Sequence, residues 1–199
     1  MHSIASKIAN YSVDHGWIES EYLAHCCYAL EKRLELGLFL LIQLIWSIPF
    51  GKAIETLSFV SVILLFRGVM GGIHASSPAS CQVLSSLVVL FAILLWGPLF
   101  ELLPYKVQFC VSVQTVMLAY ILKPAIPLQM HFTQTELRKN ISRKNVLLLC
   151  LAVIQWLSSA LSGGLFMVYS TVAIQFVILT VLMQIINSRR KGSLENEKD

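Results

Sequence analysis

A histidine and a cysteine, His74 and Cys81, stand seven residues apart between two apolar segments of the chain. A thiolate attacks carbonyl carbons and a thiol does not, and a neighbouring imidazole can generate the thiolate by accepting its proton. Gly71-Gly72 permits unusual backbone angles just before the histidine, and Pro78 interrupts any helix through both residues. The segment predicts a shaped turn with a cysteine nucleophile. Spacing alone also fits a loop histidine beside an unrelated buried cysteine.

The composition indicates where this turn must lie. Of 199 residues, 56% are hydrophobic and 13% are charged, whereas about a quarter are charged in soluble domains. The apolar runs are continuous, which favours helices over a β-barrel, and a helix needs roughly 20 residues to cross a bilayer. Pro49 and Gly51 separate two short runs and predict a tight helical hairpin. We expect an all-α integral membrane protein with about six transmembrane helices, at residues 36–50, 53–70, 82–103, 105–122, 145–162 and 165–187.

The amino-terminal region has an amphipathic pattern. Ile4, Ile8 and Tyr11 recur at helical spacing, and His15-Gly16 interrupts the pattern before it resumes. We expect two amphipathic interfacial helices on the membrane surface, although packing against the bundle fits the same pattern. The expected division is an interfacial region (1–33), a six-helix transmembrane domain (34–187) and a charged, disordered cytoplasmic tail (188–199).

Positive charge predicts the orientation in the membrane. Of the fifteen Lys and Arg residues, only Lys52 and Lys106 fall in the loops that oppose the others. Basic loops stay in the cytoplasm, so we expect both termini and the His74–Cys81 connection on the cytoplasmic side. The basic residues follow the topology and form no stripe with aromatic residues, so no nucleic-acid role is predicted.

Cysteine spacing argues against a structural metal or a disulfide framework. There is no CxxC motif, and Cys26-Cys27 has no second pair nearby. Cys110 and Cys150 lie within predicted spans, where cysteine is usually a packing residue. No metal and no cofactor are predicted. A non-enzymatic membrane peptide chaperone or transporter is the competing function, although the polar residues inside the spans are scattered singly, at Gln43, Glu55, Gln114, Gln155 and Gln175.

The pattern of Arg67, Gly71-Gly72-Ile-His74 and Cys81 between two spans resembles the accessory gene regulator B (AgrB) family of quorum-sensing peptidases. The chain length, the six expected spans and the amphipathic start are also similar to that family. The resemblance implies a multi-pass protein of the bacterial cell membrane that cuts a short amphipathic AgrD-like precursor peptide, and it is compatible with a homodimer. It implies that His74 and Cys81 form a catalytic dyad, with Arg67 and Gly72 at further functional positions.

The resemblance also bears on substrate recognition. The segment Lys123-Pro124-Ala-Ile-Pro127 lacks an aspartate that the family usually has there. The basic residues that follow, including Lys139 and Lys144, are expected to receive an acidic part of the precursor, while Gly71, Gly72 and Arg67 are expected to support substrate binding or the oxyanion. Without a peptide to bind, the same basic residues would simply set the topology.

The chemistry expected of the dyad is a thioester route. Cys81 attacks a peptide carbonyl, His74 transfers the proton to the leaving amine, and an internal Cys or Ser of the peptide then displaces Cys81 to close a (thio)lactone ring. No Asp or Glu lies between Glu55 and Glu101, so a dyad without a sequence-local carboxylate is predicted.

Overall fold

Helices make up the regular secondary structure of residues 2–71, 78–124, 134–161 and 164–196, which are the residues that the computed structural model describes. Gly72 and His74 of the predicted site lie outside these residues. The chain divides into two compact units, residues 1–50 and 51–199, and each unit is considered by itself.

The first unit consists of two packed helices joined by a short turn. Helix α1 (His2–Asp14) ends before Gly16, whose φ of 70° confirms the predicted break at His15-Gly16. Ala5 and Ala9 of α1 are fully buried where α1 packs on α2 (Leu23–Ser47). Ile4 and Tyr11 on the opposite face are 55% and 53% exposed. The helix is amphipathic, and its position on a membrane surface stays a prediction.

The second amphipathic helix expected in this region does not exist as a separate element. After the 3-10 turn η1 (Ser20–Tyr22), α2 runs without interruption through the charged segment and into the first apolar run. Lys32 donates to Glu35 over 2.9 Å, an i,i+3 pair that suits a continuous helix. No structural break therefore occurs at the expected boundary after residue 33.

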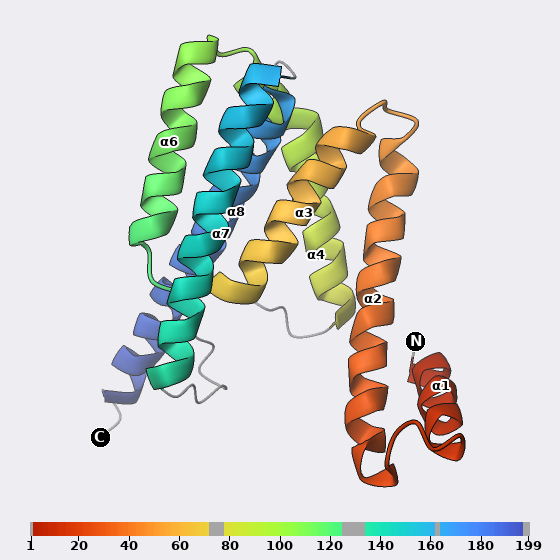
Figure 1. Cartoon of the computed structure of the whole chain (residues 1–199). Helices are drawn as coiled ribbons and strands as arrows, with labels where there is room; N and C mark the ends of the chain where they lie inside the picture. Colours follow the sequence, from red (N-terminus) through yellow and green to blue (C-terminus); the bar gives the residue numbers. More distant parts are fainter. Residues whose placement is uncertain (1, 72–77, 125–133, 162–163, 197–199) are drawn as a thin grey trace. The chain divides into compact units, whose positions relative to one another are not determined.

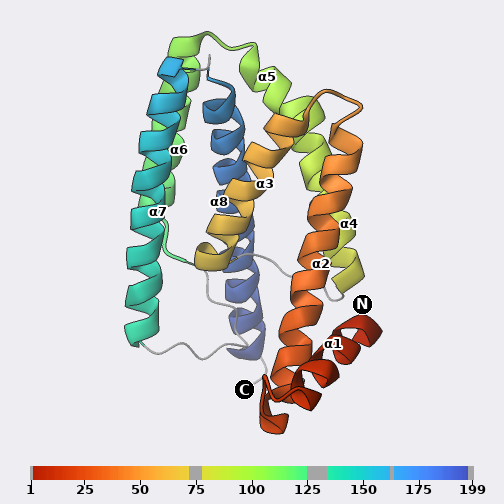
Figure 2. The same cartoon turned by 45° about the vertical axis from the view of Figure 1, so that its right-hand side comes forward.

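The second unit is built around α8 (Leu165–Asn196), which packs against α3 (Ala53–Met70), α6 (Tyr105–Ile121) and α7 (Gln134–Leu161). Figure 1 shows α6, α7 and α8 side by side. The remaining elements are α4 (Pro78–Phe91), the π-helix η2 (Ala92–Trp96) and α5 (Gly97–Glu101), and Figure 2 shows α5 leading over to the start of α6. The side chains of α8 that are fully buried include Tyr169, Val172, Ala173, Ile174 and Val181.

Four helical segments of the described chain are long and apolar enough to cross a membrane: Ala53–Met70, Ser80–Glu101, Thr135–Ala160 and Leu165–Ser188. They correspond to four of the six expected spans, and the regular structure of the described residues is all helical. Helix α2, with charged residues in its first half, and α6, with 17 residues, are not among the four. The count of six spans stays a prediction.

Two segments outside the expected spans contain helix. The connection expected at residues 123–144 contains the start of α7, because α7 begins at Gln134 and carries the basic residues in its first turns. The tail expected to be disordered from Ser188 continues α8 to Asn196. Lys and Arg are good helix formers in both segments, and in α8 their charge also lies near the carboxyl end of the helix, where it is favourable. The high charge of the tail therefore did not predict its structure correctly between Ser188 and Asn196.

Polar side chains inside the second unit bond to one another between helices, so they are not scattered singly as the sequence suggested. Gln155 of α7 is 4% exposed and donates to Ser170 of α8 over 2.7 Å. Ser112 of α6 donates to the same amide over 3.2 Å and accepts from Thr171 over 3.0 Å. In an apolar surrounding, such bonds satisfy groups that would otherwise be costly to bury.

Among the described glycines, Gly97 has the nearest neighbouring atoms, so a side chain there is predicted to destabilise the fold. A Cβ on Gly97 would lie 2.3 Å from Cε1 of the buried Tyr169 ring, whereas a Cβ on Gly68 would meet nothing within 4 Å. Gly97→Ala should lower the free energy of unfolding by about 1–3 kcal/mol because the ring has to move. Gly68→Ala, the matched control, should not lower it and should raise it by up to about 1 kcal/mol, because alanine favours a helix more than glycine does. Thermal or denaturant unfolding in detergent measures the change in the free energy of unfolding for both variants. Equal changes would contradict the close packing of Tyr169 on Gly97.

Candidate functional site

The candidate site lies where α3 ends and α4 begins. Arg67 occupies the last turn of α3, and Gly71 follows that helix with φ 78° and ψ −158°. This left-handed φ favours glycine and ends the helix. Pro78 is the first residue of α4, where its missing N–H costs nothing. Cys81 therefore lies within the first turns of a helix whose start is fixed by proline.

Arg67 and Cys81 are in direct contact across this junction. Nη2 of Arg67 donates to Sγ of Cys81 over 3.4 Å, and both side chains are half-buried. A guanidinium beside a sulfur favours the thiolate over the thiol, and so does the positive end of a helix dipole. The geometry therefore suits a cysteine that reacts as a nucleophile.

The structure brings some of the predicted site residues together and does not describe others. Arg67, Gly71 and Cys81 lie at one junction, whereas Gly72 and His74 lie outside the described residues. From the sequence, Arg67 was expected to support substrate binding or the oxyanion, and its contact with Cys81 was not predicted. The short connection between the two helices was the available signal, because it forces the end of α3 and the start of α4 to lie close together.

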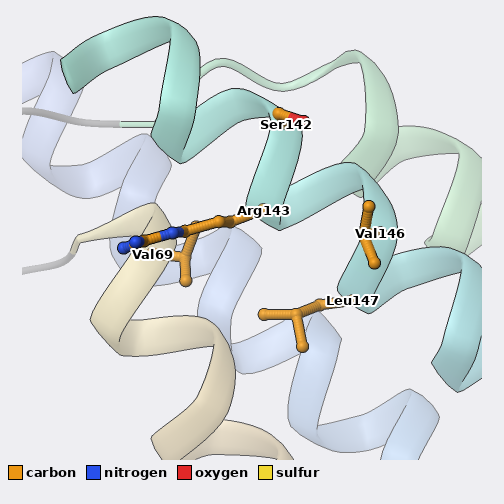
Figure 3. Close-up of a pocket in the computed structure, with 5 residues that line it drawn as sticks. All are labelled: Val69, Ser142, Arg143, Val146 and Leu147. Atoms are coloured by element: carbon orange, nitrogen blue, oxygen red, sulfur yellow. The ribbon is translucent and has the colours of Figure 1, made fainter.

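Exposed basic residues extend along the first turns of α7. Arg138, Lys139 and Arg143 are exposed. Arg143 also borders a surface hollow of about 360 Å³ between α7 and the end of α3. Figure 3 shows its side chain reaching from α7 toward Val69 of α3. The other residues around the hollow are Ser142, Val146 and Leu147.

Lys144 differs from its basic neighbours because it points into the bundle. It is 2% exposed, and its ammonium donates to the carbonyl oxygens of Tyr120 and Leu122 over 2.7 Å each. These carbonyls lie at the carboxyl end of α6, where a helix leaves such groups without intrahelical partners. Lys144 thus caps α6 and ties it to α7, and its ammonium is already engaged.

The hollow and the thiol lie on different faces of α3. Val69 is two residues beyond Arg67, which corresponds to about 200° around an α-helix. Gly68 between them is exposed, with nothing within 4 Å of the position a Cβ would take. A bound peptide that contacts both the hollow and the thiol has to cross the end of α3, and no side chain at Gly68 blocks that path.

The other cysteines do not form a second site. Cys110 and Cys150 are exposed and do not pack in the bundle as the sequence suggested, and Cys26 and Cys27 are half-buried. An exposed cysteine in an apolar helix is compatible with a lipid-facing surface. Across the described ranges, no group of three or more His, Cys, Asp or Glu side chains is arranged to hold a metal ion.

Comparison with known proteins adds a family assignment. Residues 3–187 match the family model described as Accessory gene regulator B. The match includes both units and the whole of the Arg67–Cys81 segment. No curated protein and no solved structure matches the chain.

The contact between Arg67 and Cys81 predicts the reactivity of the thiol. In Arg67→Gln, the rate at which iodoacetamide alkylates Cys81 near neutral pH should fall by about 10-fold, because a neighbouring cation favours the thiolate. The pH at which the rate reaches half its maximum should rise. Arg67→Lys should retain part of the rate, and Arg143→Gln, at the same end of the unit, should retain all of it. Equal rates in Arg67→Gln and the wild type would show that the guanidinium has no effect on the sulfur.

Proposed function

Because the chain belongs to the accessory gene regulator B family, which indicates a part in processing quorum-sensing peptides, we propose that it is a membrane cysteine endopeptidase. Its substrate is a short AgrD-like autoinducer precursor. The observation that carries the proposal is the hydrogen bond from Arg67 to Cys81 over 3.4 Å. A cation held against a half-buried thiol supports a chemical role for that cysteine.

In this proposal, Cys81 is the nucleophile and His74 the general base. His74 accepts the thiol proton, and Arg67 stabilises the resulting negative charge on Sγ. Six residues separate His74 from Cys81 in the sequence, and the turn between the helices would have to place the imidazole within hydrogen-bond reach of the sulfur.

The first reaction step transfers the peptide from nitrogen to sulfur. Sγ of Cys81 forms a bond to the carbonyl carbon, and the scissile C–N bond then breaks. The leaving amine takes its proton from the His74 imidazolium, which leaves a thioester on the enzyme. Arg67 and backbone N–H groups near Gly72 and Cys81 are the candidates to stabilise the oxyanion of the tetrahedral intermediate.

The second step closes the ring. A Cys or Ser side chain within the bound peptide attacks the thioester carbonyl, its proton passes to His74, and the Cys81 thiolate leaves. Intramolecular nucleophiles that are well placed reach effective molarities of about 10⁵ M or more, which exceeds the concentration of water. Cyclisation to a thiolactone or lactone therefore outruns hydrolysis.

The precursor would cross the carboxyl end of α3 to reach the thiol. Gly68, with nothing within 4 Å of the position a Cβ would take, leaves room for another backbone there. An acidic part of the peptide would meet Lys139 and Arg143, which are exposed on α7 next to that end. We leave Lys144 out of the peptide site, because its ammonium is buried and bonded to the end of α6.

The proposed setting is the cytoplasmic face of a bacterial membrane. The excess of Lys and Arg on one side of the predicted topology supports a cytoplasmic Cys81 and cytoplasmic termini. The exposed Ile4 and Tyr11 of α1 suit a helix that lies in the interface, where an amphipathic peptide also binds. Confinement to one plane raises the local concentration of both partners, and a homodimer is compatible with this arrangement.

A chaperone or transporter without chemistry has less support. The polar residues that would mark a pathway, such as Gln155 and Ser112, are bonded to each other between helices. Glu55 is paired with Lys52. Such groups stabilise helix packing and need not mark a path.

Substitution of the dyad tests the proposal directly. Cys81→Ser and His74→Ala should each reduce cleavage of the cognate precursor by about 10³-fold or more, because a unit of nucleophile and base fails when either is lost. Both variants should still insert and accumulate. Cys110→Ser and Cys150→Ser, the matched controls, should cleave normally, since both residues are exposed and neither belongs to the proposed dyad. Wild-type cleavage by a Cys81→Ala variant would exclude the peptidase.

A further inference from the structure

The surface hollow of about 360 Å³ between α3 and α7 lies where the apolar parts of two helices end. Val69, which lines it, is in the last turn of α3, and Arg143, which also lines it, is followed by Lys144 as the last charged residue of α7. Both helices contain candidate membrane spans. Charged side chains at the end of an apolar span stay at the membrane surface, so the hollow would lie at the level of the lipid headgroups.

Arg143 is the charged residue of the hollow, and the lining is otherwise largely apolar. Figure 3 shows its side chain reaching from α7 toward Val69, with Val146 and Leu147 further along the helix. Ser142 adds a hydroxyl to the lining. Within the described ranges, no residue forms a hydrogen bond or an ion pair with the Arg143 side chain. Such a guanidinium suits a phosphate group, because it can donate two parallel hydrogen bonds to the phosphate oxygens.

An exposed apolar stripe leads from the hollow along α7. Its members recur three or four residues apart, so they lie on the same face of the helix as Arg143. They are Val146, Cys150, Val153 and Leu157, and all four are exposed. From Arg143 to Val153 the helix rises about 15 Å, which is half of the roughly 30 Å hydrocarbon core, or one leaflet. The hollow and the stripe therefore match the two parts of a phospholipid, a charged headgroup and an apolar chain.

The charges around the hollow favour an anionic lipid. Arg138 and Lys139 are also exposed in the first turns of α7, and Glu136 is the one acidic residue of that helix. Basic pockets between spanning helices bind anionic headgroups, and a zwitterionic lipid carries an ammonium that these basic side chains would repel. An acidic peptide would explain Arg143 but not a stripe that continues one leaflet deep. We propose that the hollow binds the phosphate of an anionic phospholipid at Arg143, with an acyl chain along the stripe.

Retention of lipid by the full chain tests the site. The protein would be reconstituted in nanodiscs that contain phosphatidylglycerol and phosphatidylcholine with identical acyl chains in equal amounts, and the lipids that stay bound would be counted by native mass spectrometry. Bound phosphatidylglycerol should exceed bound phosphatidylcholine by about 5-fold or more, which is the preference that one basic residue gives for an anionic headgroup. Arg143 also lies near the acidic part of the precursor in the proposed function, so no precursor is added.

Three substitutions separate a defined site from a general attraction to basic residues. Arg143→Gln should lower the retention of phosphatidylglycerol by about 5-fold. Arg138→Gln, the matched control, removes the same charge about 140° away around the axis of α7 and should lower it by less than about 2-fold, because exposed charges outside the site are screened. Val146→Trp keeps the charge but fills the hollow from an exposed position, so it should also weaken retention. A phosphatidylglycerol with a diazirine midway along one chain should crosslink to residues 146–157 less in Arg143→Gln than in the wild type.

The proposal is wrong if the wild type retains the two lipids equally, or if Arg138→Gln lowers retention as much as Arg143→Gln, as a diffuse attraction requires. Displacement of the lipid by excess inorganic phosphate at constant ionic strength would assign the hollow to a free anion. Unchanged retention in Arg143→Gln, together with weaker binding of an acidic peptide, would assign the hollow to a peptide. None of these measurements uses the peptidase reaction, so the lipid site and the proposed function can fail independently.

Discussion

The proposed chemistry depends on a guanidinium held against a sulfur at the junction of two helices. A charged arginine near an apolar bundle is costly unless the charge has a polar partner. Here the sulfur of Cys81 accepts a hydrogen bond from Arg67 over 3.4 Å. The junction is fixed by local backbone rules: Gly71 ends α3 with a left-handed φ, and Pro78 starts α4. The reactive group is therefore positioned by two helix ends, which are more rigid than a loop.

The rest of the second unit keeps this junction in place. Helix α8 provides the buried centre against which α3, α6 and α7 pack. Lys144 anchors the end of α6 to α7, and the bonds around Gln155 join α6, α7 and α8 in the buried interior of the unit. Polar groups thus serve helix association within the bundle. The exposed basic residues, in contrast, remain at the surface where α7 starts, and are available to a partner.

The sequence predicted the elements better than it predicted the contacts. Apolar runs located four helices that can span a membrane, and His15-Gly16 located the break after α1, because hydrophobic periodicity and glycine act locally. The merger of the charged segment with α2 was missed, since helix formers and an i,i+3 pair override a change in polarity. The burial of Lys144 depends on how α6 and α7 pack, and the contact from Arg67 to Cys81 depends on how the ends of α3 and α4 meet across their short connection. Hydrophobic periodicity encodes neither.

The most direct test of the account is capture of the acyl-enzyme at Cys81. The purified protein would be mixed with its cognate precursor, quenched rapidly in acid and analysed by mass spectrometry of the intact chain and its peptides. The account predicts an adduct of the amino-terminal precursor fragment on Cys81 that hydroxylamine releases, since hydroxylamine cleaves thioesters and spares amides. Replacement of the ring-forming residue of the precursor by Ala should increase the adduct or convert the product to a linear peptide. Formation of the cyclic product with no adduct at any time, or with Cys81 chemically blocked, would contradict covalent catalysis by this residue.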